Sequence, residues 1–301
     1  MLIYKEQFED IGEGLLVRAP AKINLSLLVA GKRPDGFHEL ETIMAKINWY
    51  DEVLIEAGHK KGIELVCSGP EWSPEGEENL VYKAAEMLLK SQGKFANVRI
   101  TLAKNIPAGT GLGSASSDAA ATLLGLDKYL GLKIPSERLA EMAAALGSDV
   151  AFFLDGPLAF CTGKGEKIKK FSKFFNFLAI LVLPDLNVST KKVYANYEHN
   201  QALYEQLSAQ INSHIRKNDI DLVARMCANM LDVSSYGVVG GLTELKNKIE
   251  SLGFGPCCLS GSGPVFFFLI ESGDEKIAEK YKHKLEKLIG CKSVIASNNR
   301  W

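Results

Sequence analysis

The chain has almost no net charge. Its 301 residues include 35 lysines and arginines and 36 aspartates and glutamates, so the formal net charge is −1, and the two signs are interspersed. Without a basic field, the chain lacks the means to neutralise a nucleic-acid backbone or the surface of an anionic membrane. We therefore expect no nucleic-acid partner and no membrane partner.

Paired cysteines and long apolar runs are absent too. None of the six cysteines forms a C-x-x-C motif, and the adjacent Cys257 and Cys258 suit a buried strand better than a disulfide framework. The N-terminus is acidic and lacks the apolar core of a signal peptide. The longest apolar run, Phe174 to Pro184, is far shorter than the roughly 20 residues that span a bilayer. These features predict a protein of the reducing cytoplasm.

The segments that are present predict a compact enzyme of the α+β class. Alternating or continuous apolar segments predict strands at residues 15–19, 24–29, 51–57, 98–102 and 177–184. Helical spacing predicts helices at residues 79–92, 118–130, 136–146 and 274–288, and a mostly helical region at 191–230. Strand and helix alternate without strict βαβ order, and the chain has no repeat and no low-complexity tract.

A loop rich in glycine and serine lies between the predicted strand at 98–102 and the helix that follows. Gly109, Gly111 and Gly113 alternate, so that backbone amides can approach an anion, and hydroxyls follow at Ser114, Ser116 and Ser117. A helix N-terminus behind such a loop favours phosphate. The alternative is a glycine-rich turn with a serine N-cap.

Two common nucleotide motifs do not fit this loop. A Walker A motif requires lysine after its last glycine, whereas Gly113 is followed by serine and alanine. The G-x-G-x-G spacing also differs from the G-x-G-x-x-G of the dinucleotide fold. The loop therefore indicates phosphate binding of another type.

The chain resembles the GHMP kinase superfamily, which includes galactokinase, homoserine kinase and mevalonate kinase. Three motifs occur in the order that the superfamily has: residues 19–25 (APAKINL), residues 107–117 (PAGTGLGSASS) and residues 259–264 (LSGSGP). Residues 31–40 (GKRPDGFHEL) and 147–150 (GSDV) resemble the members that phosphorylate 4-diphosphocytidyl-2-C-methyl-D-erythritol in the non-mevalonate isoprenoid route. The resemblance covers essentially the whole chain.

The resemblance implies a two-lobed fold with mixed or antiparallel sheets packed by helices and the active site in the cleft between the lobes. Separately, a cluster of glycine and lysine at residues 163–173 predicts the change from an N-terminal domain at residues 1–166 to a C-terminal domain at 167–301. The catalytic pair is Lys22 and Asp149. The expected ATP-binding residues are Pro107, Ala108, Gly109, Thr110, Gly111, Leu112, Gly113, Ser114, Ala115, Ser116 and Ser117. The expected substrate-binding residues are Asn24, Phe37, His38, Thr190 and Tyr194.

The chemistry of these residue types agrees with the implied reaction. Phosphoryl transfer to an alcohol needs a carboxylate for the hydroxyl proton and a cation beside the phosphoryl oxygens, which Asp149 and Lys22 supply. Read without the motifs, Lys22 is a solvated strand lysine and Asp149 is a helix cap. Magnesium is expected to arrive with ATP, and no metal ligand is assigned to the protein.

Two departures from the family pattern leave other functions open. Ser114 and Ala115 occupy positions where this kinase usually has glycines, and Ala151 occupies a position where it usually has proline. The alternatives are a superfamily kinase for another small alcohol, such as homoserine or a mevalonate derivative, and a non-catalytic nucleotide-binding relative. We expect a small-molecule substrate and either a monomer or a homodimer.

Overall fold

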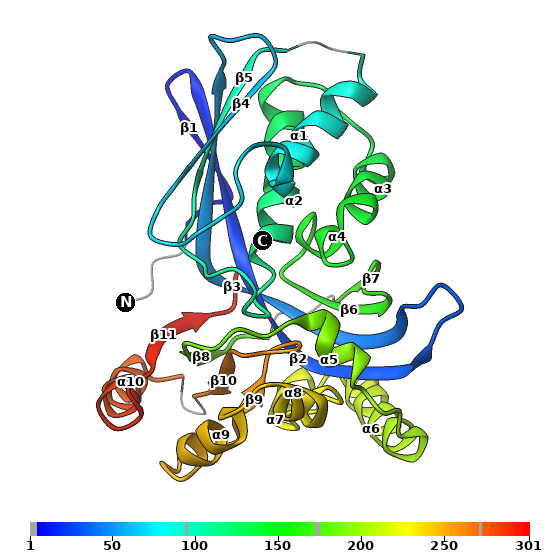
Figure 1. Ribbon diagram of the computed structural model, residues 1–301, viewed down its shortest axis with the longest axis vertical. Coiled ribbons are helices and arrows are strands. Elements are labelled where there is room, and N and C mark those ends of the chain that lie inside the picture. The colour runs from blue at the N-terminus through cyan, green and yellow to red at the C-terminus, as the bar shows by residue number, and fades with distance from the viewer. Residues whose placement is uncertain (1–4, 94–95, 172–174, 271–272) are drawn as a thin grey trace.

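A computed structural model describes residues 5–93, 96–171, 175–270 and 273–301 of the chain. Long strands run through the upper part of the molecule with helices packed on one face, and a smaller sheet with further helices lies below them (Figure 1). None of the helices in this described part is long and apolar enough to cross a membrane. The α+β class that the sequence predicts is confirmed.

The larger sheet has the order β1-β2-β3-β5-β4, with β6 paired to β3 and β7 to β6. Its strands are β1 (Phe8–Ile11), β2 (Gly14–Lys32), β3 (His38–Ala57), β4 (Ile63–Ser68), β5 (Val98–Ala103), β6 (Leu158–Gly163) and β7 (Lys167–Lys170). Its helices are η1 (Gly76–Glu78), α1 (Leu80–Ser91), α2 (Ser114–Tyr129), α3 (Ser136–Leu146) and α4 (Val150–Phe153). Helices α1 to α4 cover one face of these strands (Figure 1).

The smaller sheet has the order β11-β8-β10-β9 and is antiparallel throughout. Its strands are β8 (Leu178–Leu183), β9 (Cys258–Leu259), β10 (Phe266–Leu269) and β11 (Lys292–Ser297). The accompanying helices are α5 (Thr190–Ala195), α6 (Gln201–Lys217), α7 (Ile220–Arg225), α8 (Asp232–Val238), α9 (Leu242–Glu250) and α10 (Glu275–Ile289). The change from one sheet to the other lies between Lys170 and Leu178, and the division after residue 166 stays a prediction.

Strand β2 connects the two halves of the molecule. Val17 and Ala19 pack in the core beneath α1 and α2, whereas Ile23 and Leu25 pack in a second core that includes α7 and β8. The two strands expected at 15–19 and 24–29 are one continuous strand, because Pro20 sits at a shift in the β2–β3 register and so does not interrupt the pairing. Because side chains alternate along a strand, Lys22 and Asn24 point away from this apolar face.

The starts of helices α1 and α2 can be compared with the starts that the sequence predicts. At α1 the expected cap is present, since the Asn79 side chain accepts a hydrogen bond from the N–H of Val81 at 2.9 Å. Helix α2 begins at Ser114, four residues before the expected Asp118, because Gly113 adopts a left-handed φ of 72° and its carbonyl accepts the first helical bond from Ser117. The three serines therefore belong to the first turn of α2.

Candidate active site

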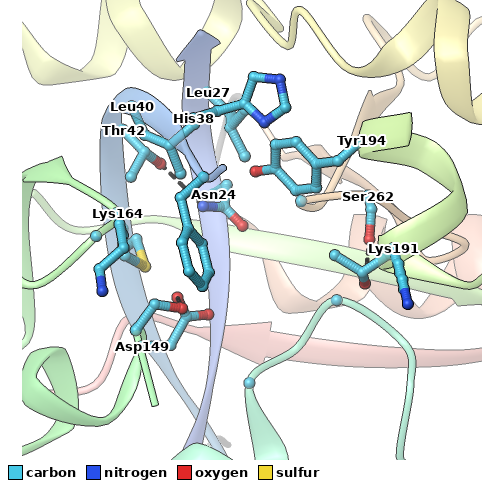
Figure 2. A pocket seen from close by; sticks show the side chains of 18 of the residues that line it. Asn24, Leu27, His38, Leu40, Thr42, Asp149, Lys164, Lys191, Tyr194 and Ser262 are labelled. Atoms are coloured by element: carbon cyan, nitrogen blue, oxygen red, sulfur yellow. Dashed lines mark hydrogen bonds between the residues drawn. The ribbon is translucent and has the colours of Figure 1, made fainter. Parts of the chain in front are cut away.

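A cavity of about 700 Å³ lies where β2, β3, the glycine loop, the start of α4, α5 and the 259–264 turn meet. Figure 2 shows Asn24 in its middle, Asp149 on one side and the rings of His38 and Tyr194 on another. The lining residues are Lys22, Asn24, Leu27, Lys32, Gly36, Phe37, His38, Leu40, Thr42, Met44, Gly111, Gly113, Ser148, Asp149, Lys164, Gly165, Thr190, Lys191, Tyr194, Ala195, Gly261 and Ser262. All seven predicted catalytic and substrate-binding residues line it.

Lys22 and Asp149 meet inside this cavity although they come from different elements. Lys22 Nζ lies 3.9 Å from Asp149 Oδ2, and the lysine side chain is only 4% exposed, against 33% for the aspartate. Asp149 precedes α4 without capping it through its side chain, so its carboxylate is free to face the cavity. Asp149 therefore occupies the N-cap position of α4, as the cap interpretation has it, but its side chain does not cap the helix.

The ammonium of Lys22 is held by polar groups of its own sheet. It donates to Asn24 Oδ1 at 2.5 Å, and Asn24 Nδ2 in turn donates to Thr42 Oγ1 at 2.9 Å. Burial lowers the pKa of Lys22 from its usual 10.5, and the charge of Asp149 opposes that shift. The solvated-lysine interpretation of Lys22 is excluded by its burial, and the network fixes one direction for its Nζ.

The glycine loop approaches the cavity through its backbone. A Cβ at Gly111 would lie 2.3 Å from the carbonyl oxygen of Ser260, and one at Gly113 would lie 2.8 Å from Phe153 Cζ and 3.0 Å from Lys22 Cγ. Both residues also have positive φ angles. Of the predicted ATP-binding residues, these two line the cavity, and the rest of 107–117 lies outside it.

The serines after Gly113 have different surroundings. The Ser117 hydroxyl is buried and has no hydrogen-bond partner within the described residues. The Ser114 hydroxyl instead donates to Asp51 Oδ2 at 2.9 Å and accepts from Lys104. This corrects the expectation that the Ser114 hydroxyl is one of the donors to phosphate, because its hydrogen-bonding capacity is used inside the protein.

An aromatic group forms the other end of the cavity. The His38 and Tyr194 rings stack with centroids 5.1 Å apart, and Tyr197 meets His38 edge-on. Burial, together with Lys32 and His199, lowers the pKa of His38, so that the neutral imidazole is favoured. Phe37 is 55% exposed, and Lys164 Nζ lies 4.7 Å above its ring.

The 259–264 turn closes the side of the cavity next to the loop. Ser260 Oγ donates to the carbonyl of Gly111 at 3.2 Å, and Thr190 Oγ1 and Ser262 Oγ lie 2.9 Å apart. The Asn229 side chain donates to the carbonyls of Leu259 and Gly261 at 3.0 and 2.7 Å. The turn thus supports this wall of the cavity through hydrogen bonds on both of its sides.

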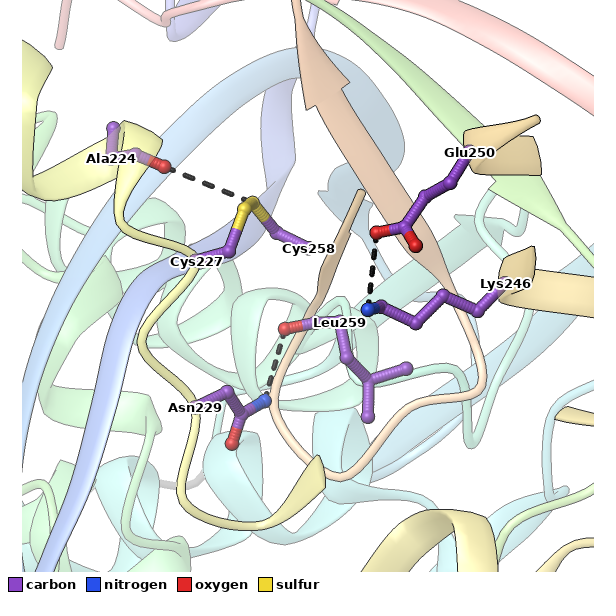
Figure 3. Close-up of a disulfide and its surroundings, with 7 residues drawn as sticks. All are labelled: Ala224, Cys227, Asn229, Lys246, Glu250, Cys258 and Leu259. Carbon is purple, nitrogen blue, oxygen red and sulfur yellow. Dashed lines mark hydrogen bonds and ion pairs between the residues drawn. A yellow bond between two sulfur atoms is a disulfide. The ribbon is translucent and has the colours of Figure 1, made fainter. Parts of the chain in front are cut away.

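A disulfide lies behind this turn, which corrects the expectation that the cysteines are unpaired. Cys227 is bonded to Cys258 across 31 residues, as Figure 3 shows beside Asn229 and Leu259. Cys258 does lie in a buried strand, as expected. The sequence does not predict this disulfide, because Cys227 and Cys258 are 31 residues apart and meet only where the fold packs the turn after α7 against β9.

Lys164 and Thr42 line the cavity and were not singled out from the sequence. Lys164 lies in the turn between β6 and β7, on the same side as Asp149 (Figure 2). In the sequence it belongs to the cluster of glycine and lysine at 163–173, which predicts a domain boundary and no site residue. Thr42, a residue of β3, carried no signal, since its role depends on pairing with β2.

Comparisons with known proteins identify the family of the chain. Residues 79–157 match the GHMP kinases N terminal domain and residues 211–287 match the GHMP kinases C terminal domain. A 4-diphosphocytidyl-2-C-methyl-D-erythritol kinase of Clostridium botulinum is 36% identical over 270 residues, covering 89% of this chain and 96% of that protein. One of Syntrophomonas wolfei is 36% identical over 93% of this chain and 99% of that protein.

Solved structures lead to the same family. A crystal structure of 4-(cytidine 5'-diphospho)-2C-methyl-D-erythritol kinase has a TM-score of 0.74 at 29% identity, covering 95% of this chain and 100% of that one. A homoserine kinase of Cytophaga hutchinsonii has the same TM-score at 21% identity, with 98% of both chains covered, and so shares the fold. The chain belongs to the 4-diphosphocytidyl-2-C-methyl-D-erythritol kinase family of the GHMP kinases.

Proposed function

We propose that this protein transfers the γ-phosphate of ATP to the 2-hydroxyl of 4-diphosphocytidyl-2-C-methyl-D-erythritol, a step of the non-mevalonate isoprenoid route. The observation that carries the proposal is the meeting of Lys22 and Asp149 in one cavity, 3.9 Å apart, between the glycine loop and the stacked rings of His38 and Tyr194. The cavity thus offers a place for phosphates, a place for the reacting hydroxyl and a place for a base.

In this proposal Asp149 orients the acceptor hydroxyl and takes its proton as the oxygen bonds to the γ-phosphorus and the bond to the β-phosphate oxygen breaks. Lys22 offsets charge on the transferring phosphoryl oxygens, and its hydrogen bond to Asn24 keeps it aimed at them. Transfer is direct, because positioning and electrostatics account for this chemistry without a covalent intermediate.

The loop at 107–117 takes the nucleotide in this proposal. Gly111 and Gly113 line the cavity with backbone that carries no side chain, and the first turn of α2, a helix of 16 residues, presents its N–H groups and the positive end of its dipole. Magnesium, when bound with ATP, would offset phosphate charge. The buried Ser117 hydroxyl, which has no hydrogen-bond partner among the residues that the structure describes, is an oxygen that suits this hard cation or one of its waters.

The acceptor side takes the cytidine diphosphate group. A cytosine ring fits against the faces of His38, Tyr194 and the exposed Phe37, and neutral His38 offers one donor and one acceptor to its polar edge. Lys164, held over the Phe37 ring, adds a cation near the diphosphate. Because both substrates belong to intracellular metabolism, we also place the enzyme in the cytoplasm.

The test is product identification with a panel of alcohols. The purified protein is incubated with ATP and magnesium, and ADP release is followed with 4-diphosphocytidyl-2-C-methyl-D-erythritol, homoserine or mevalonate as the acceptor. The proposal predicts turnover with the cytidine-containing alcohol alone and a product phosphorylated at its 2-hydroxyl. Turnover with homoserine or mevalonate would favour another small-alcohol kinase, and nucleotide binding without turnover would favour a sensor.

A further inference from the structure

A cluster of charged side chains lies beneath the glycine loop, outside the cavity. Asp51 belongs to β3, Lys104 follows β5, and Ser114 and Asp118 belong to the first turns of α2. Each of the four is at most 5% exposed. None of these four side chains has a part in the proposed phosphoryl transfer, and a buried ammonium between two carboxyl groups requires an explanation of its own.

The carboxylate of Asp51 accepts hydrogen bonds from both ends of the glycine loop. Its Oδ1 accepts from the backbone N–H groups of Asn105 and Ile106 at 2.5 and 2.9 Å, just before the loop begins. Its Oδ2 accepts from the Ser114 hydroxyl at 2.9 Å, directly after the loop ends at Gly113. The entrance and the exit of the loop are therefore held at one point of β3.

Lys104 keeps Asp51 in place and neutralises it. Its Nζ donates to Asp51 Oδ2, to Ser114 Oγ and, at 2.7 Å, to Asp118 Oδ2. Burial lowers the pKa of Lys104, but the charges of Asp118 and Asp51 outweigh burial and the pKa is raised, so the ammonium persists. Burial, and then the charge of Asp51, raise the pKa of Asp118 well above its usual value.

The Ser114 side chain joins Asp51 and Lys104 to the exit of the loop. Ser114 is the first residue of α2 and is not among the residues with positive φ, so serine fits its backbone without strain. A glycine in its place would satisfy the backbone equally well but would lack the hydroxyl. The departure from the family pattern at this position therefore adds a hydrogen bond.

We propose that Asp51 is a positioning residue for the glycine loop, acting on the loop exit through Ser114 and on the loop entrance through the backbone of residues 105–106, with Lys104 and Asp118 fixing its orientation. This inference rests on the proposed binding of ATP phosphates by the loop. Holding both ends sets the loop in its binding geometry before ATP arrives, which lowers the free-energy cost of binding.

The test compares Ser114→Ala with Thr122→Ala. Ser114→Ala removes the hydroxyl that joins Asp51 to the loop exit, whereas Thr122→Ala removes a buried hydroxyl of the same helix that donates to the carbonyl of Asp118. Calorimetry with ATP and magnesium, without acceptor, gives the dissociation constant, and steady-state kinetics give KM for each substrate. Thermal unfolding of both variants measures the structural cost.

For Ser114→Ala we expect the dissociation constant and the KM of ATP to rise about tenfold, the effect of one hydrogen bond to a charged group, with the KM of the acceptor within about twofold. Thr122→Ala should lower the melting temperature without changing the ratio of the two KM values. If the role of Ser114 were merely structural, Ser114→Ala would behave as Thr122→Ala does, with a lower melting temperature and an unchanged ratio of the two KM values. Unchanged ATP binding in Ser114→Ala, at any melting temperature, would overturn the inference.

The outcomes also separate this inference from the proposed function. If the wild type binds ATP and turns over the acceptor while Ser114→Ala binds ATP equally well, the positioning role alone fails. If Ser114→Ala binds ATP more weakly but the wild type turns over no acceptor, the proposed reaction alone fails. A wild type that binds no ATP contradicts both.

Discussion

Gly111 and Ser260 come from opposite halves of the chain, yet a Cβ on the glycine would lie 2.3 Å from the serine carbonyl oxygen. The Ser260 hydroxyl also donates to the carbonyl of Gly111 at 3.2 Å. The glycine loop of the first half and the glycine turn of the second half therefore fit against each other at the cavity.

Alanine substitutions at two glycines of the loop should separate the effect of the Gly111–Ser260 contact from the effect of backbone strain. Gly109→Ala places a Cβ in open space at a φ of 70°, so it should cost about 1 kcal/mol of stability. Gly111→Ala adds the overlap with Ser260, so it should also displace the loop and raise the KM of ATP more than about tenfold. Urea unfolding and steady-state kinetics measure the two effects. Equal KM values for the two variants would show that the contact has no effect on nucleotide binding.

The lowered pKa of Lys22 should give the rate an alkaline limit. Because burial favours the neutral amine, Lys22 of the free enzyme loses its charge below the usual pKa of 10.5, and kcat/KM should then fall about tenfold per pH unit above the lowered value. A profile of kcat/KM against pH measures this limb. The slow residual activity of Lys22→Met should lack it, and a Met variant with the same limb would assign the titration to another group.

Cytidine recognition should depend on the stacked rings. His38→Ala and Tyr194→Ala should each raise the KM of the acceptor by about 10- to 100-fold, the loss that a stacked base entails, and leave the KM of ATP unchanged. Trp72→Ala, at an exposed position outside the cavity, serves as the control. An unchanged KM of the acceptor in His38→Ala would show that the acceptor places no cytosine against the His38 ring.

The Cys227–Cys258 bond should contribute to stability where it is formed. It closes a loop of 31 residues, for which chain entropy gives about 3–4 kcal/mol, so reduction should lower the free energy of unfolding by that amount. Urea unfolding with and without reductant measures this, and Cys291→Ser is the control because Cys291 is a free thiol. Thiol titration in denaturant without reductant should find four free cysteines, and six would contradict the bond.

The residues whose roles are carried by motifs are those that the sequence could predict. Lys22 and the glycine loop are predicted from the motifs at 19–25 and 107–117, and Asp149 from the segment at 147–150. These residues come together in the structure, as do His38 and Tyr194. The helices at 80–91 and 136–146 were predicted closely, because their apolar spacing and, at Asn79, the cap are local signals.

Contacts between distant segments could not be predicted in this way. Ser114 looked like a phosphate donor, because its partners Asp51 and Lys104 are 63 and 10 residues away in the chain. The glycines and lysines around Lys164 predict a domain boundary. Its contact with the Phe37 ring depends on the fold and has no signal in the local sequence. Cys227 and Cys258 are likewise neighbours only in the fold.

The most direct test of the account is the steady-state rate of ADP release by Asp149→Asn with 4-diphosphocytidyl-2-C-methyl-D-erythritol and magnesium ATP. Asparagine keeps the shape of the side chain but cannot take the hydroxyl proton, so kcat should fall by about a hundredfold or more while both KM values stay within about threefold. Wild-type turnover together with an unchanged rate in Asp149→Asn would contradict the role given to the pair of Lys22 and Asp149.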